Sequence, residues 1–258
     1  MSKPAASSKE QFNALADNYA ASQVHRAGPS LPILLELAEP SRNDRVLDVA
    51  TGTGHTALML APFVEKVLGI DVAPKMLDQA RALAAERGQA NVSFVEGSAE
   101  TLPFAEAEFS LVTARHAPHH FRRIERFLAE VRRVLIPNGR FVMGDQICPI
   151  QEVSGWLDSW ERQRDPSHFV QRNVDQWQTE AARARFRWAA SRIVPYRLEF
   201  DWWVKTSGCS AATVGALERM AAEASPAVRD VLKLEYDERG RIIAFEEPML
   251  VVKLEPVG

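Results

Sequence analysis

Residues 45–56 constrain this chain more than any other stretch, because they form an apolar segment that runs directly into a glycine turn and then a helical pattern. The aliphatic residues at 46–49 suit a strand buried on both faces of a sheet. Gly52 and Gly54 let the backbone come close to a ligand, and the free N–H groups of the following helix point toward it. This stretch predicts a nucleotide site.

A second apolar segment, from Val67 to Asp71, ends in a carboxylate. Asp71 follows Gly52 by roughly 20 positions, which is the spacing at which an acid on the second strand reaches a ribose bound over the first turn. We therefore expect Asp71 to bind a ribose diol.

Two ligands fit this arrangement. Residues 52–57 match the fingerprint G-x-G-x-x-G/A, so an NAD-dependent oxidoreductase is one interpretation. Asp48 counts against it, because a fixed carboxylate close to the turn repels a pyrophosphate but suits the ammonium or sulfonium group of S-adenosylmethionine. The sequence favours S-adenosylmethionine.

Strand and helix patterns alternate regularly from residue 45 to 147, which predicts a doubly wound α/β fold with a mostly parallel sheet. Expected strands after the second are Val92–Glu96, Phe109–Ala114 and Arg140–Cys148, with helices from Pro74 to Gly88 and from Ile124 to Leu135. Open sheets of this kind bind ligands at the carboxyl ends of their strands, so the segment after Ala114 is the expected chemical centre.

The segment after Cys148 contains all six tryptophans and has a different pattern. We expect helices around 153–160 and 173–188, then around 211–224 and 226–234. Arg197–Val204 and Met249–Leu254 are expected to return to the sheet as its last two strands.

Composition limits the function. Net charge is −3 over 258 residues, which disfavours nucleic acid as the main partner. The polar N-terminus has no apolar core of signal-peptide length, and Cys148 and Cys209 are too few for a disulfide framework, so we expect a cytoplasmic protein without a membrane span. Histidines cluster at 116–120, but carboxylate or thiolate partners are missing nearby, so no metal site is expected.

Several motifs resemble those of class I S-adenosylmethionine-dependent methyltransferases of the UbiE-like, type 11 group. Residues 47–54 are similar to the first motif of that family, with Ala50 at its usual first glycine, where we expect φ to stay negative. Residues 97–104 resemble its Gly-Asp-Ala motif followed by Leu-Pro-Phe, with Ser98 in place of Asp, and residues 133–139 resemble Arg-Val-Leu-x-Pro-Gly-Gly.

The whole chain is most similar to a bacterial subgroup of small-molecule methyltransferases. The patterns that carry this likeness are Tyr19-x-x-Ser-x-x-His25-x-x-Gly28, Thr51–Thr56, His119–Phe121 and Arg164–His168.

This resemblance implies a Rossmann-like seven-stranded sheet of order 3-2-1-4-5-7-6, with the last strand antiparallel and a helical cap. It divides the chain into N-terminal helices and a cofactor flap (1–44), a cofactor-binding core (45–148), a cap over the acceptor pocket (149–195) and C-terminal strands and helices (196–258).

The resemblance also implies a set of cofactor-binding residues. The methionine end would lie over Ala50–Gly52 and the ribose on Asp71, with adenine between Val72 and Met76 and the Ser98–Ala99 backbone. The full set is Tyr19, His25, Asp48, Ala50, Thr51, Gly52, Gly54, Asp71, Val72, Met76, Ser98, Ala99, Glu100, Arg115 and His120.

Methyl transfer is an in-line displacement, so positioning in a dry pocket can supply most of the catalysis. A base is needed only for a hydroxyl or acidic-carbon acceptor, and His120, His25 or His168 could serve, as could His119. The turn from Arg164 to His168 and a tryptophan of the cap, Trp156 or Trp160, are expected to face the transferred methyl. This predicts an apolar or aromatic small molecule methylated on oxygen or carbon. A protein that binds S-adenosylmethionine without reaction is the alternative, and a monomer or homodimer is expected.

Overall fold

The computed structural model describes residues 8–21 and 26–258. Among these residues, seven strands form one sheet of order β3-β2-β1-β4-β5-β10-β6. The strands are β1 (Arg45–Val49), β2 (Lys66–Asp71), β3 (Val92–Glu96), β4 (Phe109–Arg115), β5 (Leu135–Gln146), β6 (Phe186–Val194) and β10 (Met249–Pro256). β1 to β5 are parallel, and β10 pairs antiparallel with both β5 and β6. The predicted order 3-2-1-4-5-7-6 is confirmed, with β10 as the antiparallel last strand.

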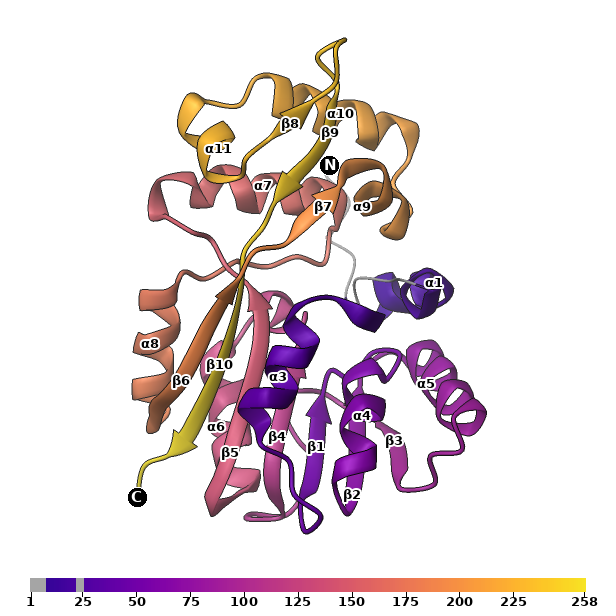
Figure 1. Ribbon diagram of the computed structural model, residues 1–258, viewed down its shortest axis with the longest axis vertical. Helices are drawn as coiled ribbons and strands as arrows, with labels where there is room; N and C mark the ends of the chain where they lie inside the picture. Colours follow the sequence, from indigo (N-terminus) through magenta and orange to yellow (C-terminus); the bar gives the residue numbers. More distant parts are fainter. Residues whose placement is uncertain (1–7, 22–25) are drawn as a thin grey trace.

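Helices cover both faces of this sheet (Figure 1). One face packs against α3 (Ser30–Ala38), α4 (His55–Leu60) and α5 (Pro74–Glu86), and the other against α6 (Ile124–Val134) and α8 (Val174–Arg183). Alternate residues of β1 serve the two cores, since Val46 belongs to the first and Leu47 to the second. Such two-sided burial explains why these strands are almost continuously apolar.

A cap module stands at the carboxyl edge of the sheet (Figure 1). It consists of α7 (Ser154–Arg164), a three-stranded sheet of order β7-β9-β8, and α9 (Phe200–Thr206), α10 (Ala211–Ala222) and α11 (Pro226–Val231). The small strands are β7 (Arg197–Glu199), β8 (Glu235–Tyr236) and β9 (Ile242–Glu246). α1 (Ser8–Ala21) packs against α5 and α9, so it bridges the core and the cap module.

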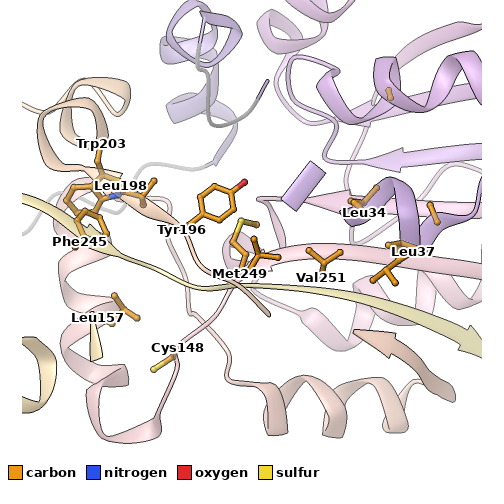
Figure 2. Close-up of a cluster of buried hydrophobic side chains, with 14 of the residues drawn as sticks. Leu34, Leu37, Cys148, Leu157, Tyr196, Leu198, Trp203, Phe245, Met249 and Val251 are labelled. Atoms are coloured by element: carbon orange, nitrogen blue, oxygen red, sulfur yellow. The ribbon is translucent and has the colours of Figure 1, made fainter. Parts of the chain in front are cut away.

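The core of the cap module is aromatic. Trp160 is fully buried, with its ring centroid 4.7 Å from Trp203 and 4.8 Å from Phe245. Figure 2 shows Tyr196 and Met249 between this group and the sheet-side residues Leu34 and Val251, so one hydrophobic core joins the cap module to the sheet.

Two predictions about the C-terminal part were wrong. The sixth strand is β6, whereas residues 197–204 divide into the short β7 and the start of α9. The predicted helix reaching Trp188 ends earlier, because Arg185 has a left-handed φ of 60° and the chain then pairs with β10. α8 consequently lies on β6 and α6, beside the sheet, while α7 packs with α10 in the cap module.

Candidate active site

A pocket of about 500 Å³ opens at the carboxyl ends of β1, β2, β3 and β4, beneath α1. Most of the predicted cofactor residues line it: Tyr19, Asp48, Ala50, Thr51, Gly52, Asp71, Val72, Met76, Ser98, Ala99, Glu100, Arg115 and His120. His25, predicted both to close over the cofactor and to act as a base, lies outside the described residues. The strand-end reasoning thus brings together residues that are far apart in the sequence.

The turn after β1 is left-handed at three positions, with φ of 52° at Ala50, 54° at Gly52 and 82° at Gly54. The expectation that Ala50 keeps a negative φ was therefore wrong. The turn bends too sharply for extended backbone here, because the Thr51 N–H must reach the carbonyl of Ile70 (3.0 Å). A Cβ costs about 1–2 kcal/mol in this conformation, so Ala50 is strained.

Gly54 does not line the pocket. It precedes the first residue of α4, and a Cβ on it would approach Ala80 and Phe94 at 3.1 Å. The left-handed φ and the close packing against α5 and β3 both favour glycine here.

Asp71 holds the first two strand ends together. Its carboxylate accepts hydrogen bonds from the N–H groups of Gly52 (2.8 Å) and Ala73 (2.9 Å). The side chain is buried, and burial raises its pKa above the ordinary value. Each carboxylate oxygen keeps a second lone pair, so Asp71 can also accept hydrogen bonds from a ligand's hydroxyls.

Asp48 lies under the turn and accepts hydrogen bonds from the hydroxyls of Thr51 and Thr113, both at 2.6 Å. Burial raises its pKa to about 6, against the opposing effects of these hydroxyls and of Arg115. The Arg115 side chain is itself buried and donates to Thr56 (3.2 Å) and Ser30 (3.3 Å). A buried carboxylate beside the turn provides a counter-charge for a cationic ligand group.

The far end of the pocket is formed by the loops after β2 and β3. Val72 and Met76 lie on one side, and Gly97 to Glu100 on the other. A Cβ on Gly97 would come within 2.6 Å of the Cδ1 of Ile70, so a larger residue there would require the Ile70 side chain to move. The Glu100 carboxylate accepts from the backbone N–H and the Nε of Arg123, both at 3.0 Å, which fixes this loop.

The near end of the pocket is lined by Phe12 and Tyr19 of α1, His116 and His120 after β4, and Ser167 after α7. The ring of Phe12 lies edge-on to Tyr19 (5.4 Å) and to His120 (5.1 Å). Burial raises the pKa of Tyr19 to about 12, so its hydroxyl stays protonated. This end of the pocket is aromatic, and α1 forms part of its wall.

The hydrogen bonds of His120 fix its tautomer. Its Nδ1 lies 3.1 Å from the carbonyl oxygen and 3.2 Å from the hydroxyl oxygen of Ser167, whose proton goes to Asp165 (2.7 Å). Both oxygens near Nδ1 therefore accept, and Nδ1 carries the proton of the neutral ring. Burial, and then the neighbouring His119, lower the pKa of His120 to about 3, which leaves Nε2 with a free lone pair near neutral pH.

Two further histidines lie behind His120. His119 Nδ1 is 2.7 Å from Asp145, and His168 Nε2 is 2.8 Å from Asp158. The His119 ring centroid is 4.1 Å from His120 and 5.6 Å from His168. Burial raises the pKa of Asp145 to about 7 and lowers that of His119 well below its ordinary value, so this pair shares one proton.

Three residues expected to face the acceptor, Trp160, His168 and Arg164, do not line this main pocket. Trp160 fills the core of the cap module, and His168 is buried against Asp158. Arg164 donates to Glu161 (2.9 Å) and to the Trp203 carbonyl (3.3 Å), and it borders a second, smaller cavity. The polar turn after α7 contributes Ser167 instead, because Arg164 and His168 pair with carboxylates inside the protein.

Sequence reasoning missed several parts of the wall, namely Ser8, Lys9 and Phe12 of α1 and Thr53, His55 and Thr56 after β1. Ser167 belongs to the turn from Arg164 to His168 that was expected to face the acceptor, and it is the residue of that turn that lines the pocket. Nothing in the spacing of Phe12 indicates that α1 crosses the pocket. Thr53 and His55 lie inside the recognised glycine motif, and their position there was the available signal.

Within residues 8–21 and 26–258, no group of three or more His, Cys, Asp or Glu side chains is arranged to hold a metal ion. None of the helices in the same part of the chain has both the length and the apolar character needed to cross a bilayer.

Comparison with known proteins identifies the family. Residues 47–143 match the methyltransferase domain family. The uncharacterised methyltransferase YcgJ of Bacillus subtilis is 32% identical over 235 residues, which cover 91% of this chain and 93% of YcgJ. The crystal structure of YcgJ superposes with a TM-score of 0.83 at 31% identity, covering 89% of this chain and 99% of that one. This chain belongs to the class I S-adenosylmethionine-dependent methyltransferases of the UbiE-like type.

Two other relatives of this methyltransferase show how the likeness is distributed. The uncharacterised protein YafE of Escherichia coli is 31% identical over 187 residues, or 71% of this chain and 89% of YafE. The demethylmenaquinone methyltransferase of Thermus thermophilus is 45% identical over 112 residues, but these cover only 42% of this chain and 50% of that protein. The likeness to YcgJ extends over most of the chain, whereas the likeness to the quinone enzyme is partial.

The cofactor of this methyltransferase is S-adenosylmethionine, and the NAD interpretation of the glycine turn does not hold. The residues present fit that cofactor. Gly52 has open space where a Cβ would stand, and the carboxylates of Asp71 and Asp48 suit a ribose diol and an ammonium group. A volume of about 500 Å³ is within the usual range for small-molecule sites.

Proposed function

We propose that this methyltransferase modifies an oxygen or an acidic carbon of a planar, mostly apolar small molecule. The acceptor would bind at the near end of the pocket, against Phe12, Tyr19 and His120. The observation that carries this proposal is the fixed tautomer of His120, which leaves an unprotonated nitrogen on a residue of the pocket wall.

The chemistry asks little of the protein beyond positioning. S-adenosylmethionine, when bound, supplies the methyl group as an electrophile on sulfur. The aromatic wall excludes water and orients a flat acceptor, and effective molarities of well-oriented partners correspond to roughly 7–11 kcal/mol of barrier.

His120 is proposed as the base. Its lowered pKa makes it a weak base, which is sufficient because an oxygen becomes strongly acidic as its new bond to carbon forms. Ser167 holds the ring by accepting from Nδ1, and Asp165 holds the Ser167 hydroxyl. The side chain can therefore receive a proton at Nε2 without changing its orientation.

The residue assignments in the cofactor pocket, from Tyr19 to His120, are part of this proposal, as is closure by the segment around His25. The four-part division of the chain, a cytoplasmic location and a monomeric or homodimeric state also stay predictions. The neutral overall charge supports a small-molecule acceptor more than nucleic acid.

The test is an untargeted methylation assay. Purified protein is incubated with S-adenosylmethionine carrying a labelled methyl group and with a metabolite extract. We expect label in a small molecule that contains a planar ring. Label confined to nucleic acid or protein, or no transfer at all, would contradict the proposal.

Once an acceptor is known, His120→Ala should lower kcat by about 10²-fold while the affinity for S-adenosylhomocysteine stays within a few-fold of wild type. An unchanged kcat would show that no base is used. A loss of cofactor affinity instead would place His120 in cofactor binding only.

A further inference from the structure

A second cavity of about 40 Å³ adjoins the pocket, and His116 lines both. Its walls come from the carboxyl edge of the sheet and from the cap module. Two of the residues around it, Tyr196 and Met249, lie where Figure 2 shows the two halves of the core meeting, and a third, Trp203, belongs to the cap module. The His116 ring packs edge-on against Tyr196, with centroids 5.8 Å apart.

Polar groups in this cavity lack protein partners. Gln146 lines it, and its buried Nε2 makes no hydrogen bond to any described residue. Arg164 uses Nη1 for Glu161 and Nε for the Trp203 carbonyl, and no described residue accepts from its Nη2. A buried donor such as the Gln146 Nε2 is rarely left unpaired, so it points to a missing oxygen acceptor beside Arg164.

The charges around the cavity also favour an oxygen ligand. Glu161 balances Arg164. Glu247 accepts a hydrogen bond from Gln171, and burial, together with the nearby Glu161, raises its pKa well above the ordinary value. This rise in pKa favours the protonated, neutral form of Glu247, which lessens the repulsion that a carboxylate ligand would meet.

We propose that this cavity receives a carbonyl or carboxylate group carried on the ring of the acceptor, with Gln146 and Arg164 as its hydrogen-bond donors. This inference rests on the proposed function. Tyr196, Trp202 and Trp203 form the apolar part of the cavity wall. The small volume admits one oxygen-bearing group but not a ring. The ring would lie on the pocket side of His116, and the acceptor is then an aromatic acid or an aromatic carbonyl compound.

A buried water molecule is the competing occupant, because about 40 Å³ is enough to hold one. Calorimetry separates the two. The complex with S-adenosylhomocysteine is titrated with benzoate and with benzyl alcohol, which has the same ring without the carboxylate. We expect benzoate to bind at least tenfold more tightly.

Gln146→Leu should weaken benzoate binding about tenfold and leave S-adenosylhomocysteine affinity within twofold. Arg164→Lys, which keeps the charge opposite Glu161, should act in the same direction. Gln178→Leu, on the exposed side of α8, is the matched control and should change neither. Equal binding of the two probes, or benzoate binding that survives Gln146→Leu, would mean that the cavity holds only water.

Failure of this inference differs from failure of the proposed function. If benzoate is not preferred but the extract assay yields a methylated ring compound, the inference about the second cavity is wrong and the proposed function stands. If benzoate binds as expected but no methylated product forms, the proposed transfer reaction falls instead.

Discussion

Asp71 links the turn after β1 to the segment after β2, since it accepts hydrogen bonds from Gly52 and Ala73, and it is proposed to bind the ribose. We expect Asp71→Ala to weaken S-adenosylhomocysteine binding by about 1.5–3 kcal/mol, the range for a hydrogen bond to a charged group. Calorimetry measures this. Asp78→Ala, on the exposed face of α5, is the control and should leave the affinity unchanged. An unaltered affinity in Asp71→Ala would refute the ribose assignment.

Asp48 should make cofactor binding depend on pH. Its pKa in the free protein is raised to about 6, so the carboxylate is charged at pH 7.5 and mostly protonated at pH 5. An ammonium group binds the charged form, so affinity for S-adenosylhomocysteine should fall about tenfold between these pH values, or about 1.4 kcal/mol. Asp48→Asn should bind weakly at both. If wild-type affinity is flat over this range, Asp48 does not bind the ammonium group.

Ala50 stores strain that glycine would release. Removing its Cβ should gain about 1–2 kcal/mol, less about 0.4–1 kcal/mol for the greater freedom of the unfolded chain. Ala50→Gly should therefore leave Tm unchanged or raise it by a few degrees in a thermal melt. Ala82→Gly, at an exposed position inside α5, should lower Tm by about 2–4 °C. Equal losses in both variants would show that Ala50 is unstrained.

At the scale of elements, α1 is the helix whose stability should depend most on whether the pocket holds a ligand. Phe12 and Tyr19 contribute to the wall, and most of the helix's packing is against α5 and α9. We expect S-adenosylhomocysteine to slow amide hydrogen exchange in residues 10–21 by about tenfold or more, because a ligand under the helix opposes its opening. Exchange in α10, at residues 211–222, should not change. Equal effects on both helices would indicate global stabilisation only.

Residues 22–25 of the predicted flap from Tyr19 to Gly28 lie outside the described residues, so its closure stays a prediction. The same exchange experiment extends to it, and unchanged protection of residues 19–30 on cofactor binding would contradict it.

The sequence predicted some elements well for a physical reason. β1 to β4 are continuous apolar runs bounded by glycine and proline turns, so local pattern alone located them to within a few residues. Local pattern did not locate β6. Its residues are mostly half-buried at the edge of the sheet, and its pairing partner, β10, lies about 60 positions away. The helical spacing of Trp177, Ala181, Ala184 and Trp188 predicted one long helix, although the last of these residues belongs to β6.

The site divides in the same way. Asp48, Asp71 and Ser98 follow strands, and the topology fixes where strand ends meet, so their assembly was predictable. Ser167 and Phe12 reach the pocket through contacts between distant segments. Arg164 and His168 do not line the main pocket as predicted. The side chains of a polar turn are normally free to face a ligand or solvent, whereas here Arg164 and His168 pair with the buried carboxylates of Glu161 and Asp158.

At the scale of the whole molecule, the cofactor should stabilise the fold by mass action. At a concentration of S-adenosylhomocysteine 100 times its Kd, the gain is about 2.7 kcal/mol, which corresponds to a rise in Tm of about 5–10 °C for a chain of this length. A thermal melt with and without ligand measures it. NADH at the same concentration is the control and should give no shift. A comparable shift with NADH would reopen the choice of cofactor.

The position of β10 between β5 and β6 has a consequence for biosynthesis. Every described residue of the cofactor pocket precedes residue 168, yet β5 keeps an open, apolar edge until residues 249–256 have emerged from the ribosome. Such an edge pairs readily with other chains, and long-range strand pairing is slow. The nascent protein therefore has to wait, with its catalytic half already synthesised, for a strand encoded some 100 codons later, and this interval is when it most needs protection from aggregation.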